Sequence, residues 1–241
     1  MKFKYVTLTD TGLKRIENED SYGVYNVEGG LLVVVCDGLG GNKAGNVASK
    51  LAVDTISKTF QGLDGTEYLE RIKLSILEAN KIVIEESNKD FDRKGMATTV
   101  ETLYLKGDTA YWGHVGDSRL YYLKNNKLKQ LSKDHSLVQK LIDEGYLTLK
   151  EAENHPNKNI IMRALGDSDN VEVDTSKIKI SPADSGKFFV CTDGVTTVLQ
   201  NDELENILVN DNPHYISEAI ANLVEKRGAP DNYTFVIITE A

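Results

Sequence analysis

Five aspartates mark the places in this chain where chemistry is most strongly indicated. Each stands at or near the end of an apolar stretch or in a tight acidic turn: Asp20, Asp37, Asp117, Asp193 and Asp231. Two carboxylates about 4 Å apart repel by roughly 4 kcal/mol at an effective dielectric of about 20. If the fold gathers several of them, a cation must lie among them. Oxygen ligands with no nearby Cys₂ or His₂ pattern favour Mg²⁺ or Mn²⁺ over zinc, so the sequence indicates metal-assisted chemistry.

An arginine close to the first aspartate adds a candidate anion-binding group. Arg15 lies five residues before Asp20, and a guanidinium beside a metal site can hold two phosphate oxygens at once. The alternative is a surface arginine that pairs with Glu17 or Glu19, and these residues alone leave both interpretations open.

A glycine-rich segment, Gly38-Leu39-Gly40-Gly41, follows a buried strand and precedes a helix, as in nucleotide-binding loops. The spacing fits neither nucleotide motif, because Lys43 stands where a dinucleotide fingerprint needs its third glycine. A Walker loop fails as well, since Asn46 follows Gly45. The glycines more plausibly let the backbone approach a metal or its waters, with the Gly38 carbonyl as a candidate ligand.

The histidines and cysteines form no competing site. The spacing of the four histidines fits no zinc motif, and we expect structural roles for His114, on a strand, and His214, near a helix start. Cys36 and Cys191 lie on apolar strands. We expect both to be buried reduced thiols of a cytoplasmic protein rather than a disulfide.

The composition is that of an ordinary globular protein. The chain has 241 residues, 40% hydrophobic and 27% charged, and we expect one domain over residues 1–241. The net charge of −9 argues against a general affinity for nucleic acid or anionic membrane. The sequence has no run of 18 apolar residues and no long apolar region near its start, so we expect neither a membrane span nor a signal peptide.

Short strand-like segments dominate the chain. They are expected at 3–8, 31–35, 98–105, 110–115, 120–123, 128–131, 171–180, 188–191 and 233–239. Amphipathic helices are expected at 44–60, 69–83, 137–142 and 216–224, with a short capped turn at Thr148 to Glu151. Because two adjacent helices come early and many strands follow, antiparallel sheets covered by helices fit better than a doubly wound sheet.

An ordered set of short motifs carries a family resemblance. They are Gly12-x-x-Arg15-x-x-Asn18-Glu19-Asp20, Cys36-Asp37-Gly38-x-Gly40-Gly41, Gly95-x-x-Thr98-Thr99, Gly116-Asp117-Ser118-Arg119, Asp134-His135-Ser136, His155-Pro156, Arg163-Ala164-Leu165-Gly166, Thr192-Asp193-Gly194 and Asp231-Asn232. Each motif alone is weak, whereas the ordered set is highly specific. The chain resembles the metal-dependent serine/threonine protein phosphatases of type 2C, particularly the bacterial single-domain members, over nearly its whole length.

The resemblance implies an α+β fold, a four-layer α/β/β/α sandwich of two antiparallel β-sheets flanked by helix pairs. It also implies a binuclear Mg²⁺ or Mn²⁺ centre at one edge of the sandwich. In that centre Asp37 bridges the two metals that hold the attacking water, and the Gly38 carbonyl binds one of them. Asp193 and Asp231 hold the other metal. Such a pair of ions, about 3.5–4 Å apart, activates one bridging water for in-line attack on phosphorus.

The same resemblance implies roles around this centre. Asp20 acts through metal-bound water, and Asp117 joins Asp193 in holding a third metal found in bacterial relatives. Arg15 matches the phosphate-binding arginine. Glu19 and Asn232, next to ligands, are candidates for the shell that fixes metal-bound waters.

The chain departs from the family pattern in the active-site loops. Leu39 stands where some members carry a histidine that can act as general acid, and where a methionine is familiar, so protonation of the leaving group falls to a water. Val195-Thr196-Thr197 replaces a segment that often holds an aspartate, and we expect altered loop packing there. Residues 136–159, a segment marked by the motifs at His135 and at His155-Pro156, correspond to the mobile flap of bacterial relatives, which we expect to set substrate preference.

These observations predict a cytoplasmic, monomeric phosphatase that hydrolyses phosphoserine and phosphothreonine in proteins with Mn²⁺ or Mg²⁺. Its partners would be phosphorylated proteins, including a serine/threonine kinase and the substrates of that kinase. Two alternatives stay open: a catalytically weak module that binds phosphoproteins, and a phosphatase of small phosphate esters. The full set of acidic ligands argues against the binding module, which would have no need to hold so many carboxylates together.

Overall fold

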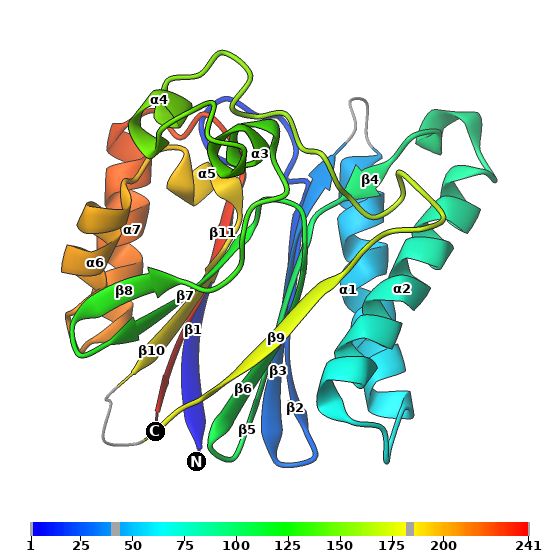
Figure 1. Ribbon diagram of the computed structural model, residues 1–241, viewed down its shortest axis with the longest axis horizontal. Helices are drawn as coiled ribbons and strands as arrows, with labels where there is room; N and C mark the ends of the chain where they lie inside the picture. The colour runs from blue at the N-terminus through cyan, green and yellow to red at the C-terminus, as the bar shows by residue number, and fades with distance from the viewer. Residues whose placement is uncertain (1, 40–43, 182–185, 241) are drawn as a thin grey trace.

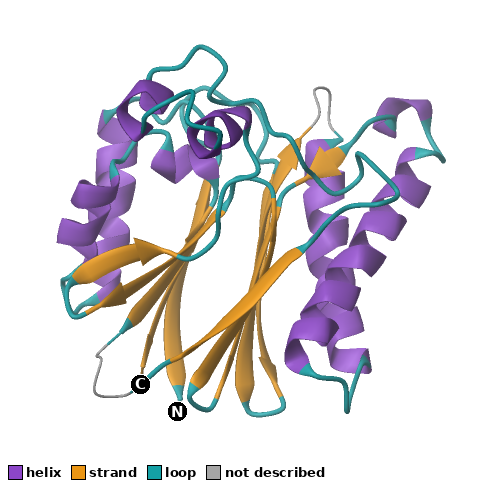
Figure 2. Ribbon diagram, in the orientation of Figure 1, coloured by secondary structure: helices purple, strands orange, loops and turns teal. Residues whose placement is uncertain are grey.

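The structure is a computed structural model that describes residues 2–39, 44–181 and 186–240. Two antiparallel sheets lie face to face, with helices on both outer faces (Figures 1 and 2). The four-layer α+β arrangement implied by the family resemblance is confirmed. None of the described helices is long and apolar enough to cross a membrane.

The first sheet has the strand order β1-β11-β10-β7-β8. Its strands are β1 (Phe3–Asp10), β7 (Arg119–Lys124), β8 (Lys127–Gln130), β10 (Lys187–Cys191) and β11 (Tyr233–Glu240). The second sheet has the order β2-β3-β5-β6-β9, with β4 paired to β3. Its strands are β2 (Asp20–Val27), β3 (Gly30–Leu39), β4 (Ala97–Thr98), β5 (Val100–Lys106), β6 (Thr109–Val115) and β9 (Asp174–Lys179).

The helices divide between the two outer faces and one end of the sandwich. Helices α1 (Gly45–Gly62) and α2 (Tyr68–Ser87) cover the second sheet, and α6 (Asn201–Leu208) and α7 (Pro213–Lys226) cover the first (Figure 2). A short 3₁₀ turn, η1 (Phe91–Arg93), follows α2. Helices α3 (Leu137–Asp143), α4 (Leu149–Glu153) and α5 (Asp193–Thr196) lie at the upper end in Figure 1.

Strand β3 shows why its sequence is a continuous apolar run. Leu32, Val34 and Cys36 pack with α1 and α2, whereas Leu31, Val33 and Val35 belong to the cluster between the sheets. Alternate side chains of a strand point to opposite faces, so a strand buried on both sides needs apolar residues at every position. The predicted burial of 31–35 on both faces is confirmed.

The predicted elements differ from the structure at several points, including the split of the predicted strand at 98–105 into β4 and β5. Strand β2 was not anticipated, because its sequence mixes Gly23 and Asn26 with apolar residues and only one face is well covered. The predicted strand at 171–180 begins only at Asp174, and its first valines pack as loop residues against the α1–α2 layer. Helices α5 and α6 were also missed: α5 is a single turn, and α6 buries only Leu204 and Leu208.

Candidate metal centre and active site

The predicted carboxylates come together at the upper end of the sandwich in Figure 1. Asp20 begins β2, Asp37 lies near the end of β3, and Asp117 lies between β6 and β7. Asp193 lies two residues after the end of β10, and Asp231 lies two residues before the start of β11. Because neighbouring strands are antiparallel, the end of one strand and the start of the next meet at the same edge of the sandwich. The topology therefore gathers residues separated by more than 200 positions in the sequence.

Asp20 and Asp37 are direct cross-strand neighbours in the β2–β3 ladder. The Thr192 hydroxyl donates a hydrogen bond of 2.9 Å to Asp20 Oδ2, while Asp20 Oδ1 is buried without a partner. Thr99 holds the Asp37 backbone from both sides, since its Oγ1 accepts from the Asp37 N–H and its own N–H donates to the Asp37 carbonyl. The two carboxylates are thus fixed by the backbone before any ion binds.

Asp193 and Asp231 meet where the start of α5 contacts the start of β11. Gly194 makes this contact close, because a Cβ atom there would overlap the Asn232 carbonyl oxygen. The Thr192 N–H donates to the Thr234 carbonyl at 3.0 Å, which closes the two segments together. The motif Thr192-Asp193-Gly194 therefore needs its glycine for packing and its aspartate for the acidic centre.

Asp117 lies in a tight turn that is buried on all sides. Its Oδ1 atom is buried with no hydrogen-bond partner. Gly116 adopts φ +114°, and a Cβ there would come within 2.6 Å of Thr99 side-chain atoms. Next to it, Ser118 Oγ lies 2.7 Å from Thr99 Oγ1, the atom that also accepts from the Asp37 amide. Hydrogen bonds thus connect the Asp117 turn to the Asp37 strand.

The electrostatics of the centre show that these carboxylates repel one another. Burial, and then the charges of the other four aspartates, raises the pKa of Asp37 well above its usual range. Burial raises the pKa of Asp20 to about 7 and that of Asp117 to about 8, with Asp193 adding to both. Burial followed by the charge of Asp231 also raises the pKa of Asp193. Such shifts identify a place where negative charge is held without enough compensation.

The donor set fits a hard divalent cation. Asp20 and Asp117 each present a buried oxygen that lacks a partner, and all candidate side-chain donors are oxygens. Among the described residues no three acidic, histidine or cysteine side chains form a ready-made metal cage. Mg²⁺ and Mn²⁺ suit this arrangement, because such ions are often held by one or two carboxylates and keep several waters.

Glu19 and Asn232 support the centre from its edge. The Asn232 side chain accepts from the Glu19 N–H at 2.9 Å and donates to the carbonyls of Thr11 and Glu17. Gly38 donates its N–H to the Glu19 carbonyl, and a Cβ on Gly38 would come within 2.6 Å of that oxygen. The candidate carbonyl ligand of Gly38 thus belongs to a closely packed turn. Gly40 and Gly41 lie outside the described residues.

Arg15 reaches the centre rather than its sequence neighbours. Its Nη2 donates to Asp231 Oδ2 at 2.8 Å, and its side chain is 49% exposed. The alternative pairing with Glu17 or Glu19 does not occur as an ion pair. A guanidinium has five N–H donors in a planar fork, so donors remain for an incoming anion.

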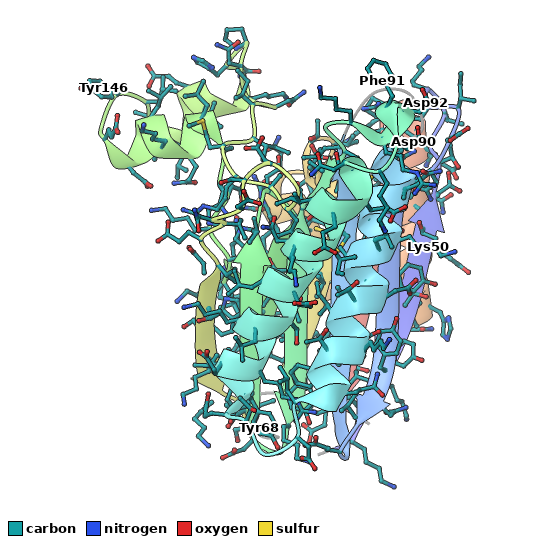
Figure 3. All side chains as sticks on the ribbon, turned by 90° about the vertical axis from the view of Figure 1, so that its right-hand side faces the viewer. Lys50, Tyr68, Asp90, Phe91, Asp92 and Tyr146 are labelled. Atoms are coloured by element: carbon teal, nitrogen blue, oxygen red, sulfur yellow. The ribbon has the colours of Figure 1, made fainter. Side chains whose placement is uncertain are left out.

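A cleft of about 260 Å³ leads away from the centre beneath the flap. Its inner end is lined by Asp117 and Asp193, and its walls include Ile142 and Leu149 of the flap and Leu199 after α5. The flap helices α3 and α4 stand out from the sandwich, with Tyr146 at their outer end (Figure 3). No residue of α3 is buried, although its sequence is amphipathic. The apolar side of this helix therefore faces a space that solvent or a ligand can occupy.

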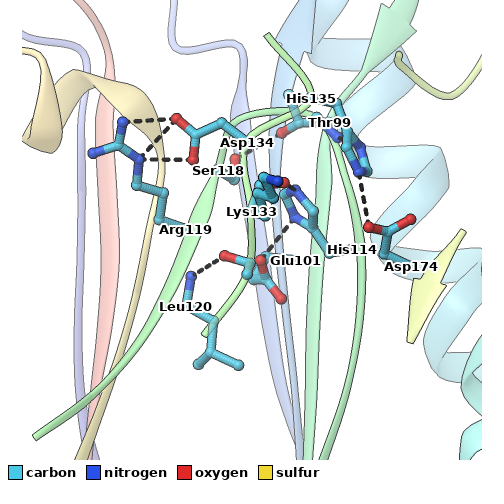
Figure 4. Close-up of polar contacts among 12 residues, drawn as sticks. Thr99, Glu101, His114, Ser118, Arg119, Leu120, Lys133, Asp134, His135 and Asp174 are labelled. Carbon is cyan, nitrogen blue, oxygen red and sulfur yellow. Dashed lines mark hydrogen bonds and ion pairs between the residues drawn. The ribbon is translucent and has the colours of Figure 1, made fainter. Parts of the chain in front are cut away.

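Some residues that hold the site were not singled out from sequence. Arg119 makes a bidentate ion pair with Asp134, with bonds of 2.7 and 3.0 Å (Figure 4). Thr99 and Thr192 fix Asp37 and Asp20. These four residues all belong to the short motifs quoted above. Membership of a motif was therefore the signal in the sequence that could have identified them, whereas their contacts are set by the tertiary structure.

Comparisons with known proteins point in one direction. The family profile described as protein phosphatase 2C matches residues 14–230. A serine/threonine phosphatase of Listeria welshimeri is 36% identical over 238 residues, covering 95% of this chain and 93% of its own. The crystal structure of the serine/threonine phosphatase Stp1 from Staphylococcus aureus has a TM-score of 0.93 at 28% identity, covering 100% of this chain and 96% of its own. The catalytic domain of the serine/threonine protein phosphatase PstP, solved with two manganese ions, has a TM-score of 0.86 at 29% identity, covering 98% of this chain and 97% of its own.

We expect the metal-free protein to lose stability as the pH rises from 5 to 8. The pKa of Asp20 is raised to about 7 and that of Asp117 to about 8, above an unfolded value of about 3.9. These carboxyls therefore stabilise the fold fully below about pH 4, and that contribution is lost as the pH rises through 8. Urea unfolding in EDTA, followed by Trp112 fluorescence, should show a loss of several kcal/mol, about 1.4 kcal/mol per pH unit for each group below its folded pKa.

The matched control is Asp37→Asn, which removes one repelling charge and should flatten this pH dependence. Saturating Mn²⁺ should also remove it, because the ion neutralises the cluster. A metal-free stability that stays level or rises from pH 5 to 8 would contradict the mutual repulsion described here.

Proposed function

The chain belongs to the protein phosphatase 2C family, and from this premise we propose that it removes phosphate from phosphoserine and phosphothreonine in proteins with Mn²⁺ or Mg²⁺ bound at the carboxylate centre. It is a protein serine/threonine phosphatase, as its relatives are. The observation that carries the metal proposal is the cluster of buried and partly buried aspartates whose pKa values are raised by burial and by one another. Above the raised pKa values, where these groups are ionised, bound cations would offset that repulsion.

We assign the ligands as follows. Asp37, which is affected by the charges of the other four aspartates, would hold two ions, one together with the Gly38 carbonyl and the other together with Asp193 and Asp231. Asp20, whose carboxylate accepts from the Thr192 hydroxyl, would act through a water. Asp117 and Asp193 would hold a third ion. When bound, the ions supply positive charge for the phosphoryl oxygens and an activated water for in-line attack.

Arg15 binds and orients the phosphate in this proposal. Its bond to Asp231 places the guanidinium at the rim of the centre, and its half-exposed side chain leaves donors facing solvent. A planar fork of donors matches two phosphoryl oxygens, which a lysine cannot reproduce. Leu39 beside the centre has no proton to give, so the proton for the leaving oxygen comes from water.

The surroundings of the centre favour a polypeptide over a small phosphate ester. Large apolar side chains are exposed on both sides of it: Ile16 is 97% exposed next to Arg15, and Leu149 and Tyr146 are each 72% exposed on the flap. Exposed apolar groups gathered around a polar site are typical of surfaces that bind other proteins. The cleft beneath the flap then receives residues next to the phosphorylated one.

We further propose that residues 1–241 act as one phosphatase domain and as a monomer. Its partners are phosphorylated proteins, including a serine/threonine kinase and the substrates of that kinase. Cys36 and Cys191 are buried free thiols. Free thiols are typical of proteins in a reducing compartment, and we propose the cytoplasm as the location.

The central test is phosphate release from a phosphothreonine peptide with and without Mn²⁺. We expect turnover that depends on Mn²⁺ and is abolished by Asp37→Asn, because the amide cannot bridge two cations. Asp169→Asn, an exposed substitution of the same kind, serves as the matched control and should leave turnover unchanged. A folded wild-type protein that binds phosphopeptides without any turnover would favour the binding module instead.

Substituting Arg15 should weaken the phosphate step. Arg15→Ala is expected to lower kcat/KM about 10- to 100-fold, the effect of losing one hydrogen bond to a charged group. Arg15→Lys should recover only part of this loss, because an ammonium does not bind two oxygens in one plane. Equal kcat/KM values for Arg15→Ala and wild type would remove Arg15 from the phosphate site.

Exchanging the flap should change substrate preference without removing chemistry. A chimaera that carries the corresponding segment of the Listeria relative in place of residues 136–159 should rank phosphopeptides differently from the wild type. Its turnover of p-nitrophenyl phosphate, which is too small to reach along the cleft, should stay close to wild type. An unchanged ranking of peptides would show that the flap does not select substrates.

A further inference from the structure

A buried ion pair lies below the active-site end of the second sheet and outside the proposed metal ligands. Glu101 of β5 and His114 of β6 are direct cross-strand neighbours, and each has 0% of its surface exposed. His114 Nδ1 lies 2.9 Å from Glu101 Oε2 (Figure 4). A buried charged pair costs desolvation energy and often stabilises no more than an apolar pair of the same size. Its position therefore calls for another explanation.

The second ring nitrogen of His114 contacts the backbone of a neighbouring loop. Nε2 lies 3.1 Å from the Lys133 carbonyl oxygen, which can only accept, so Nε2 carries a proton. Nδ1 and Oε2 lie within ion-pair distance without forming a well-aligned hydrogen bond, and one of them carries the remaining proton of the pair. The pair is neutral overall with that proton on either atom, and in both cases the imidazole is held in the orientation that donates to Lys133.

Lys133 belongs to a loop that grips the Gly116 turn. Two residues further on, the His135 N–H donates to the Gly116 carbonyl at 2.7 Å, and the Gly116 N–H donates back to His135 Nδ1 at 3.0 Å. Burial lowers the pKa of His135 to about 4, which leaves Nδ1 able to accept. The rings of His114 and His135 also contact each other, with centroids 4.6 Å apart.

The same loop is the root of the flap. The Met162 N–H, three residues beyond the flap, donates to the His135 carbonyl at 2.7 Å. Ser136 pairs with Ile161 as an isolated bridge. One short segment, Lys133 to Ser136, is thus bonded to the buried His114 below, to the Gly116 turn beside it and to both ends of the flap.

We infer that Glu101 and His114 act as a positioning pair that fixes the Asp117 turn and the root of the flap through the Lys133–His135 loop. The contacts run from Glu101 to His114, to the Lys133 carbonyl, and through His135 to Gly116, which precedes Asp117. Neither residue touches the substrate. The part of the inference that concerns metal binding rests on the proposed role of Asp117, whereas the link between the pair and the turn does not.

Amide hydrogen exchange on the metal-free protein tests the link. Glu101→Leu removes the charged group that faces Nδ1, and exchange at Gly116 and His135 should be about tenfold faster, as expected for the loss of one buried polar contact. Glu101→Gln should stay near wild type, because its amide can donate to Nδ1 while Nε2–H still donates to Lys133. Thr102→Val, a buried substitution at the next position of β5, is the matched control and should not affect these amides.

Exchange in β11 reports on the fold as a whole. If Glu101→Leu accelerates exchange equally in β11 and at Gly116, the pair only stabilises the sheet and the inference is wrong. Should this variant fail to fold, His114→Gln carries the same expectation, because one amide cannot reach both Glu101 and the Lys133 carbonyl. Wild-type exchange rates at Gly116 and His135 in a folded variant would also overturn the inference.

Calorimetric titration with Mn²⁺ alone adds the second readout. We expect Glu101→Leu to weaken Mn²⁺ binding about tenfold, as loss of a supporting partner around a metal site does, and Glu101→Gln to bind as wild type does. If Glu101→Leu speeds exchange but leaves the Mn²⁺ affinity unchanged, the pair supports only the root of the flap. Its inferred effect on Asp117 as a metal ligand is then wrong. If the wild type takes up no Mn²⁺, the proposed function fails, while the exchange experiment still decides the positioning role.

Discussion

The repulsion among five carboxylates gathered at one end of the sandwich is the constraint on which the rest of this structure depends. A carboxylate with no partner is costly to bury, and the partly buried Asp37 lies amid the charges of four others. The two sheets supply the energy to hold them there, because their facing surfaces and both helical layers are apolar. Under the proposed function, bound cations would offset this repulsion, so the stability of the scaffold and the chemistry of the site would depend on the same carboxylates.

The site is built mainly from backbone contacts, which explains its glycines and threonines. Gly194 and Gly38 lie where any side chain would meet a neighbouring carbonyl. Thr99 and Thr192 use their hydroxyl groups to hold Asp37 and Asp20. Rigid strand ends can hold oxygen ligands with little rearrangement, and ligands held in advance favour catalysis over mere binding. The flap helix α3 has no buried residue and the Arg15 side chain is half exposed, so both are more open to solvent than these strand ends.

The Glu101–His114 pair supports the active-site end of the sandwich from inside the second sheet. It joins the interior of one sheet to the loop from which the flap emerges. A charged pair in that place specifies one orientation of a histidine ring, which an apolar pair of the same size cannot do. The root of the flap and the Asp117 turn are thereby bonded to the same loop.

The sequence by itself determined the aspartates and their order in the motifs, the oxygen-only donor set, the buried strand at 31–35 and the two long helices. These follow from residue type and from periodicity, which are local properties. Strand β2 and helix α6 were not predictable in this way, because their mixed sequences become ordered only against neighbours. Likewise, only the tertiary structure paired Arg15 with Asp231 and Arg119 with Asp134. Contacts between residues distant in the chain depend on strand order and register, and no short segment of sequence encodes those.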